Sequence, residues 1–161
     1  MKLLQYRQYI DTECTTLPDP VLPVKAIKLD GEGKDSLKNA LELADIKTCD
    51  YLRNRKGEAL LIECSDLVRQ RNNELPIYQQ LTELAEDVAD REQKRSVLNK
   101  IKRMKPDACI RQEMKYKCIH SLLLLYRLGE RSGFRVEEKF NRGIKFVVAI
   151  CTHSTSDVMA F

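Results

Sequence analysis

The stretch that decides the fold is residues 50–65, DYLRNRKGEALLIECS. A two-residue turn at Lys56-Gly57 makes it a β-hairpin in which Asp50 lies opposite Glu63. Directly opposed residues share one face of a sheet, with Cβ atoms about 5 Å apart. Two carboxylates held so close repel each other, and such a pair commonly holds a divalent cation or a proton. The hairpin therefore predicts a candidate metal site.

The register of the hairpin leaves an alternative open. Lys-Gly is a weaker signal for a tight hairpin turn than Asn-Gly or Asp-Gly. A turn one residue earlier, with Gly57 as a bulge, would place Asp50 opposite Ile62 and turn Glu63 to the other face. A further alternative is an ordinary hairpin without a site, in which Asp50 only marks the entrance of one strand and Glu63 the exit of the next.

The remaining chain predicts helices and one further strand. Asp35 or Ser36 is positioned to cap a helix. Two long helical patterns follow, over about 76–104 and about 108–128. The apolar positions of the second pattern are Met114, Cys118, Leu122 and Leu125. Residues 144–152, IKFVVAICT, form the strongest strand pattern in the chain.

These elements predict an α/β (α+β) fold with a small mixed central sheet flanked by helices. The second hairpin strand, 59–64, is apolar on both faces, which is typical of a central strand. The last strand should pair beside it, after the two long helices. A length of 161 residues suits one domain. We expect that domain to comprise an irregular N-terminal segment, 1–33, in which residues 1–13 could form a short strand or a helix, and a core, 34–161.

Charge is unevenly distributed along a mildly basic chain, with a net charge of +4 and a pI near 8.7. Residues 94–105 are basic without any acid, and the stretch before them, 83–92, is mostly acidic. A helix with acidic residues early and basic residues late also complements its own dipole. A basic helical side can follow the phosphates of DNA or RNA, or dock onto a protein partner in a complex. The basic residues of 94–105, where no acid occurs, are Lys94, Arg95, Lys100, Lys102, Arg103 and Lys105.

Cysteine and histidine usage predicts no further catalytic site. The six cysteines show no CxxC spacing, and we interpret them as reduced thiols packed as small apolar groups. His120 and His153 have no metal-ligand spacing, so we expect a packed and a surface residue, respectively. The N-terminus lacks a signal-peptide pattern, and no apolar run is long enough to span a membrane. We expect a cytoplasmic protein without membrane contact.

The hairpin resembles the PD-(D/E)XK nuclease superfamily. The residues that carry the resemblance are KTCDYL at 47–52 and LLIECS at 60–65. That family places an aspartate on one strand and an E-x-K triplet on the next, after a helix that often carries a glutamate. The resemblance implies Mg²⁺ held by Asp50 and Glu63, with Glu42 as a third acid, and metal-dependent phosphodiester cleavage.

The chain departs from the family at one position, because Ser65 stands where the family has its lysine. Lys47 does not substitute, since it falls on the opposite face from Asp50 in a regular strand. Lys115 or Lys117, early on the helix expected to pack on the sheet, could reach the site. The alternative for both lysines is the solvated side of that helix.

Two functional hypotheses follow. In the first, the chain is a Mg²⁺-dependent nuclease component of a restriction or antiviral defence system. In the second, it keeps a nuclease-like sheet without chemistry and serves as an accessory or assembly subunit of a larger protein or nucleoprotein complex. Ser65 favours the second hypothesis, and the presence of both Asp50 and Glu63 favours the first.

Overall fold

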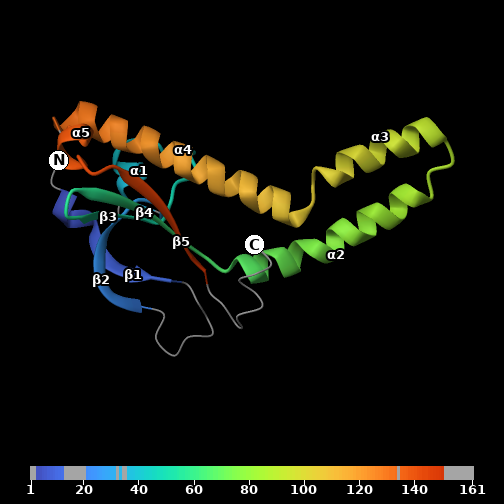
Figure 1. Ribbon diagram of the computed structural model, residues 1–161, viewed down its shortest axis with the longest axis horizontal. Coiled ribbons are helices and arrows are strands. Elements are labelled where there is room, and N and C mark those ends of the chain that lie inside the picture. Colours follow the sequence, from blue (N-terminus) through green and yellow to red (C-terminus); the bar gives the residue numbers. More distant parts are fainter. Residues whose placement is uncertain (1–2, 13–20, 32, 34–35, 134, 151–161) are drawn as a thin grey trace. The chain divides into compact units, whose positions relative to one another are not determined.

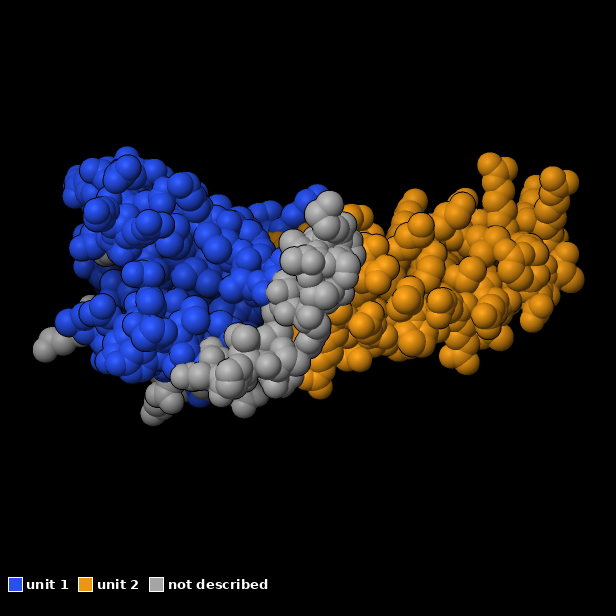
Figure 2. All heavy atoms as spheres, turned by 60° about the horizontal axis from the view of Figure 1, so that its bottom comes forward, with its two compact units in different colours: residues 1–65, 115–151 blue, residues 66–114, 152–161 orange. Residues whose placement is uncertain are grey.

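The computed structural model describes residues 3–12, 21–31, 33, 36–133 and 135–150. Cys14, Asp35, Cys151 and His153, which the sequence analysis considered, lie outside these residues. Contacts divide the chain, for which the sequence predicted one domain, into two compact units (Figure 2). We call them the sheet unit, residues 1–65 and 115–151, and the helical unit, residues 66–114 and 152–161.

The sheet unit contains five strands and helices packed on them (Figure 1). Its elements are a 3-10 helix η1 (Leu3–Tyr6), β1 (Arg7–Asp11), β2 (Val21–Lys28), α1 (Leu37–Ala40), β3 (Tyr51–Arg55), β4 (Glu58–Ser65), the later part of α4 (Pro106–Ser132), α5 (Val136–Lys139) and β5 (Ile144–Ile150). The sheet order is β1-β2-β3-β4-β5, with β4 and β5 parallel and the other pairs antiparallel. The predicted mixed sheet flanked by helices, with the last strand beside the second hairpin strand, is confirmed.

The first predicted register of the hairpin is confirmed. Lys56 has φ 52° and Gly57 has φ 85°, which are the two positive angles of a type I′ turn. Arg55 pairs with Glu58 at one end of the hairpin. The side-chain oxygen Oδ1 of Asn54 accepts a 3.0 Å hydrogen bond from the Gly57 N–H, which stabilises the turn.

The main core lies between the sheet and the helices of the sheet unit. Leu52 and Leu61 point from β3 and β4 into a cluster that also contains Leu124, Leu125 and Leu128 of α4. The opposite face of the sheet carries a second cluster, whose described members all come from strands. Its buried residues are Ile10, Ala26, Tyr51, Ile62 and Cys64. Successive residues of β4 therefore alternate between two apolar environments, which explains its continuous apolar sequence.

The N-terminal third differs from its prediction. Residues 1–33 were expected to be irregular apart from a short strand or helix within 1–13, but they contain two strands, β1 and β2. β2 includes Pro23, which lacks a backbone donor and is tolerated where a ladder hydrogen bond is absent. The helix expected after Ser36 is a single turn, Leu37–Ala40, and Ser36 at its N-cap position makes no side-chain capping bond.

The sequence predicted one helix over 76–104, but in the helical unit this stretch is broken between two helices, α2 and α3. α2 spans Leu67–Glu86 and α3 spans Arg91–Lys102. The cause of the break is Asp90, whose carboxylate accepts a 2.7 Å hydrogen bond from the Gln93 N–H and caps α3. Asp66 caps α2 in the same way, so the helix begins at Leu67, nine residues before Pro76, which lies inside it.

Candidate active site

The hairpin places Asp50 and Glu63 at the end of β4, on the side of the sheet that faces α4. Tyr51 pairs with Ile62, so continuing the ladder by one residue sets Asp50 opposite Glu63. The Asp50 carboxylate accepts a 2.7 Å hydrogen bond through Oδ2 from the Cys64 N–H. This bond anchors Asp50 across the two strands.

Glu63 forms the centre of the candidate site. Its side chain is only 1% exposed, and its Oε1 accepts a 2.5 Å ion-pair contact from Lys117 Nζ. The Ser65 hydroxyl donates to the same oxygen at 2.6 Å. The other oxygen, Oε2, is buried and has no hydrogen-bond partner among the residues that the structure describes. One carboxylate oxygen therefore has two partners, and the other has none among the described residues.

Lys117 reaches Glu63 because α4 is fixed against the segment before β3. The Ser121 hydroxyl accepts a 2.9 Å hydrogen bond from the Cys49 N–H and donates to the Lys117 carbonyl at 2.7 Å. One turn away, His120 Nδ1 lies 3.1 Å from the Lys47 carbonyl oxygen. Residues 117, 120 and 121 share one side of the helix, so these contacts hold the Lys117 side chain over the sheet.

The negative charge of the site affects the pKa of the Cys49 thiol. Burial raises the pKa of its thiol to about 12, which the Ser121 hydrogen bond opposes and the charges of Glu63 and Asp50 increase. Both carboxylates thus act on one thiol, in agreement with their placement on the same face. At neutral pH Cys49 is a protonated core residue and is unsuited to nucleophilic chemistry.

Two residues predicted for the site lie elsewhere. Glu42 was expected as a third metal ligand, but its side chain is 79% exposed and pairs with Arg131 at 2.8 Å. That hydrogen bond and the Arg131 charge lower the pKa of Glu42. Lys115 is exposed to solvent, two residues from Lys117 on α4. The structure therefore joins Lys117 and Glu63 in an ion pair, places Asp50 opposite Glu63 by strand register, and leaves Glu42 and Lys115 outside the group.

Asp50 and Glu63 carry carboxylate oxygens, the ligand type that Mg²⁺ prefers in proteins. Mg²⁺ in proteins is commonly held by one or two carboxylates, with water completing the coordination. Among the residues that the structure describes, no group of three or more histidine, cysteine or acidic side chains is placed to hold a metal. Two carboxylates, one with a buried oxygen lacking a partner, therefore form the candidate site.

The predicted nucleic-acid-binding residues lie on and just after α3, in the helical unit. Lys94 is engaged locally, because its Nζ pairs with Glu86 at 2.6 Å. The other five are exposed and form no ion pair with any residue in the described part of the chain. These five are Arg95, Lys100, Lys102, Arg103 and Lys105. These five side chains are therefore exposed to solvent, whereas Lys94 is paired with the end of α2.

The sequence analysis missed the residues that position Lys117. Ser121 was not singled out, although a buried hydroxyl amid the leucines of α4 was a visible signal. Cys49 was treated only as a packed thiol, and its backbone N–H is the group that Ser121 binds. Such contacts depend on the rotation of α4 about its own axis, which the predicted apolar positions did not determine.

No protein-family model, no curated protein and no solved structure was found to match the chain. Within the described residues, no helix is both long and apolar enough to cross a lipid bilayer.

Proposed function

We propose that the chain is a metal-dependent nuclease of the PD-(D/E)XK type in which α4 supplies the lysine. The observation that carries the proposal is the contact between Lys117 Nζ and the buried Glu63 carboxylate, on the sheet face where Asp50 lies opposite. Ser65 occupies the usual lysine position, yet its hydroxyl binds Glu63 and leaves space for a cation from the helix. Lys117, which lies 52 positions after Ser65 in the chain, would thus take the chemical role of the motif lysine.

Each residue has a role that follows from its surroundings. Asp50 and Glu63 would hold a magnesium ion, which when bound lowers the pKa of water and stabilises negative charge on a phosphate. Lys117 is 15% exposed, so its ammonium can contact both Glu63 and a phosphate at the surface. An ammonium at that place attracts the scissile phosphate and neutralises charge that develops on it. Ser65 and Ser121 position the two charged side chains.

The competing hypothesis is an inactive nuclease-like scaffold that assembles with a partner. It is favoured by the near-complete burial of Glu63 and by the engagement of Oε1 with both Lys117 and Ser65. In that case the ion pair only stabilises the sheet, and the chain serves as an accessory subunit. The two hypotheses differ in whether the site binds a divalent cation.

Metal binding and cleavage of DNA and RNA test the proposal together. We expect Mn²⁺ or Mg²⁺ to bind the wild-type protein, Asp50→Ala to abolish binding, and Glu42→Gln to leave it unchanged. Cleavage should fall at least 100-fold in Lys117→Met and stay near wild type in the matched control Lys115→Met. Absence of both metal binding and cleavage on every substrate would favour the scaffold. A role in defence against foreign nucleic acid is part of the same proposal.

A further inference from the structure

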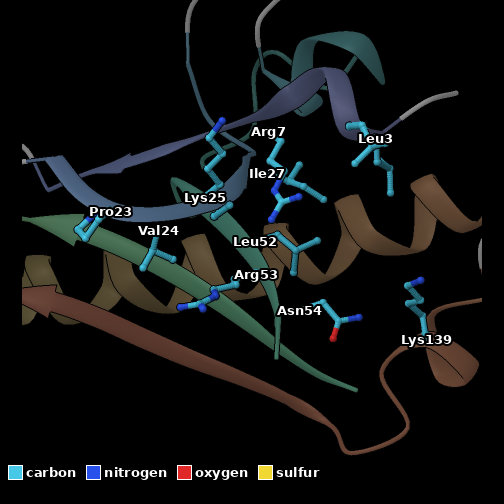
Figure 3. Close-up of a pocket in the computed structure, with 12 residues that line it drawn as sticks. Leu3, Arg7, Pro23, Val24, Lys25, Ile27, Leu52, Arg53, Asn54 and Lys139 are labelled. Carbon is cyan, nitrogen blue, oxygen red and sulfur yellow. The ribbon is translucent and has the colours of Figure 1, made fainter. Parts of the chain in front are cut away.

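A second feature of the sheet unit lies where β2 separates from β3. The two strands share only two residue pairs, Ile27 with Leu52 and Lys28 with Tyr51. Beyond them β2 diverges, and Pro23 within it cannot donate a ladder hydrogen bond. The divergence leaves a pocket of about 610 Å³ between the strands, bordered by η1, β1 and α5 (Figure 3). That volume is within the range of small-ligand sites.

The pocket is lined by four basic residues and no acidic one. The four are Arg7, Lys25, Arg53 and Lys139, which come from β1, β2, β3 and α5. None of them forms an ion pair with any residue that the structure describes. Some exposed basic residues of the same unit are paired, as Arg131 is with Glu42 and Lys145 with Glu58. Cations gathered from four elements without a counter-charge create a positive potential suited to an anion.

The arrangement of these side chains gives the pocket a polar mouth and an apolar wall. Figure 3 shows the Arg7 guanidinium pointing from β1 toward the space beside Ile27 and Leu52. Lys139 of α5 and Asn54 of β3 also line the pocket (Figure 3), and the Asn54 side-chain amide can both donate and accept hydrogen bonds there. Lys25 is partly engaged, because its Nζ lies 4.6 Å from the centre of the Tyr9 ring.

We propose that this pocket binds the phosphate of a nucleotide, with the nucleotide's ring system against the apolar wall. Arginine and lysine are the preferred phosphate ligands of proteins, and arginine can contact two phosphate oxygens at once. The apolar wall, formed by Leu3, Ile27 and Leu52, excludes water from one side of the bound group. The nucleotide is either free or one unit of a nucleic-acid strand. The inference does not depend on cleavage at Asp50, Glu63 and Lys117.

The test is a titration of the whole chain in the presence of EDTA, so that no metal-dependent cleavage occurs. The probes are a nucleoside 5′-monophosphate, a single-stranded oligonucleotide of eight residues, and inorganic phosphate. The variant Arg7→Gln/Lys139→Gln removes two exposed pocket cations and should fold, which circular dichroism verifies. The matched control Arg55→Gln/Arg111→Gln removes the same charge at exposed positions that do not line the pocket.

We expect nucleotide binding that the pocket variant weakens at least tenfold and the control variant by less than threefold. Saturation by the monophosphate identifies a free nucleotide, and binding of the oligonucleotide alone identifies a strand. For the strand, the salt dependence of log K should decrease by about 1.4 in the pocket variant, since each lost phosphate contact contributes about 0.7. The inference is overturned by equal losses in both variants, by no nucleotide binding, or by inorganic phosphate binding as tightly as the nucleotide.

Discussion

Replacement of Lys117 by methionine tests the contact on which the candidate site depends. The substitution keeps most of the volume and removes the charge that faces Glu63. Glu63 is 1% exposed and would keep only the Ser65 hydroxyl as a partner. A buried carboxylate without its counter-charge is strongly unfavourable, so we expect Lys117→Met to destabilise the sheet unit.

The size of the effect follows from the burial of the two groups. Breaking a buried ion pair by removing one partner costs about 3–5 kcal/mol. Lys117 is 15% exposed, so water can partly replace it, and we expect the lower end, about 3 kcal/mol. Glu63→Gln should cost less, about 1–2 kcal/mol, because the amide still accepts from Ser65 and the ammonium can reach water. In the double variant both charges are gone, and the loss should be about 2 kcal/mol smaller than the sum of the two single losses.

Urea unfolding measured by tyrosine fluorescence checks this cycle. Five of the six tyrosines, all except Tyr78, belong to the sheet unit, so the signal reports mainly on it. With a slope of about 2 kcal/mol per molar urea, Lys117→Met should lower the midpoint by about 1.5 M. Lys115→Met, at an exposed position on the same helix, is the control and should lie within about 0.5 kcal/mol of wild type. Single losses that add within about 0.5 kcal/mol would show that Lys117 and Glu63 do not interact.

Three further predictions concern other parts of the sheet unit. Burial raises the pKa of Cys49 from 9.0 to about 12, so the unfolded chain releases this proton first as the pH rises. Above pH 9 the stability of the wild type should therefore fall relative to Cys49→Ala, by about 1.4 kcal/mol per pH unit until about pH 12. Urea unfolding at pH 8 and 10.5 measures this difference, and parallel stability profiles of the two proteins would contradict it. In the same assay Lys56→Asn should stabilise the hairpin by about 0.5 kcal/mol, because asparagine adopts positive φ more readily than lysine. Gly57→Ala should destabilise it, since the added Cβ would lie 2.5 Å from Asn141 Oδ1. A destabilised Lys56→Asn protein would refute the type I′ turn. Glu42→Gln should leave the urea midpoint unchanged because its pair with Arg131 is at the surface, and a shift as large as that of Glu63→Gln would place Glu42 in the core.

The hairpin was predictable because its determinants are local. Gly57 takes positive φ without strain, and the position of the turn fixes every pair along both strands. Once the turn lies at Lys56-Gly57, the facing of Asp50 and Glu63 follows from the two-residue period of a strand. The parallel placement of β5 beside β4 was likewise readable, since both strands are apolar on each face and a helical connection separates them.

The helices were less predictable because apolar spacing alone does not determine their ends or rotation. Of the expected inner face of α4, Leu125 is buried as predicted, whereas Met114, Cys118 and Leu122 are only partly buried. Leu124 and Leu128, which were not predicted, are buried as well. The sequence from residue 121 to 125, SLLLL, offers several apolar stripes of similar strength. The choice among them is made by tertiary contacts, including the hydrogen bond between Ser121 and Cys49.

The same rotation of α4 decides which lysine enters the site. Lys115 and Lys117 are two positions apart and therefore about 200° apart around a helix with 3.6 residues per turn. Only one of them can face the sheet, and the burial of Ser121, one turn after Lys117, selects Lys117. A change that rotated the helix to bury Cys118 and Leu122 fully would remove Lys117 from Glu63 and leave a buried carboxylate without a cation. Ser121→Ala should therefore weaken metal binding and cleavage, although Ser121 lies outside the proposed set of metal ligands.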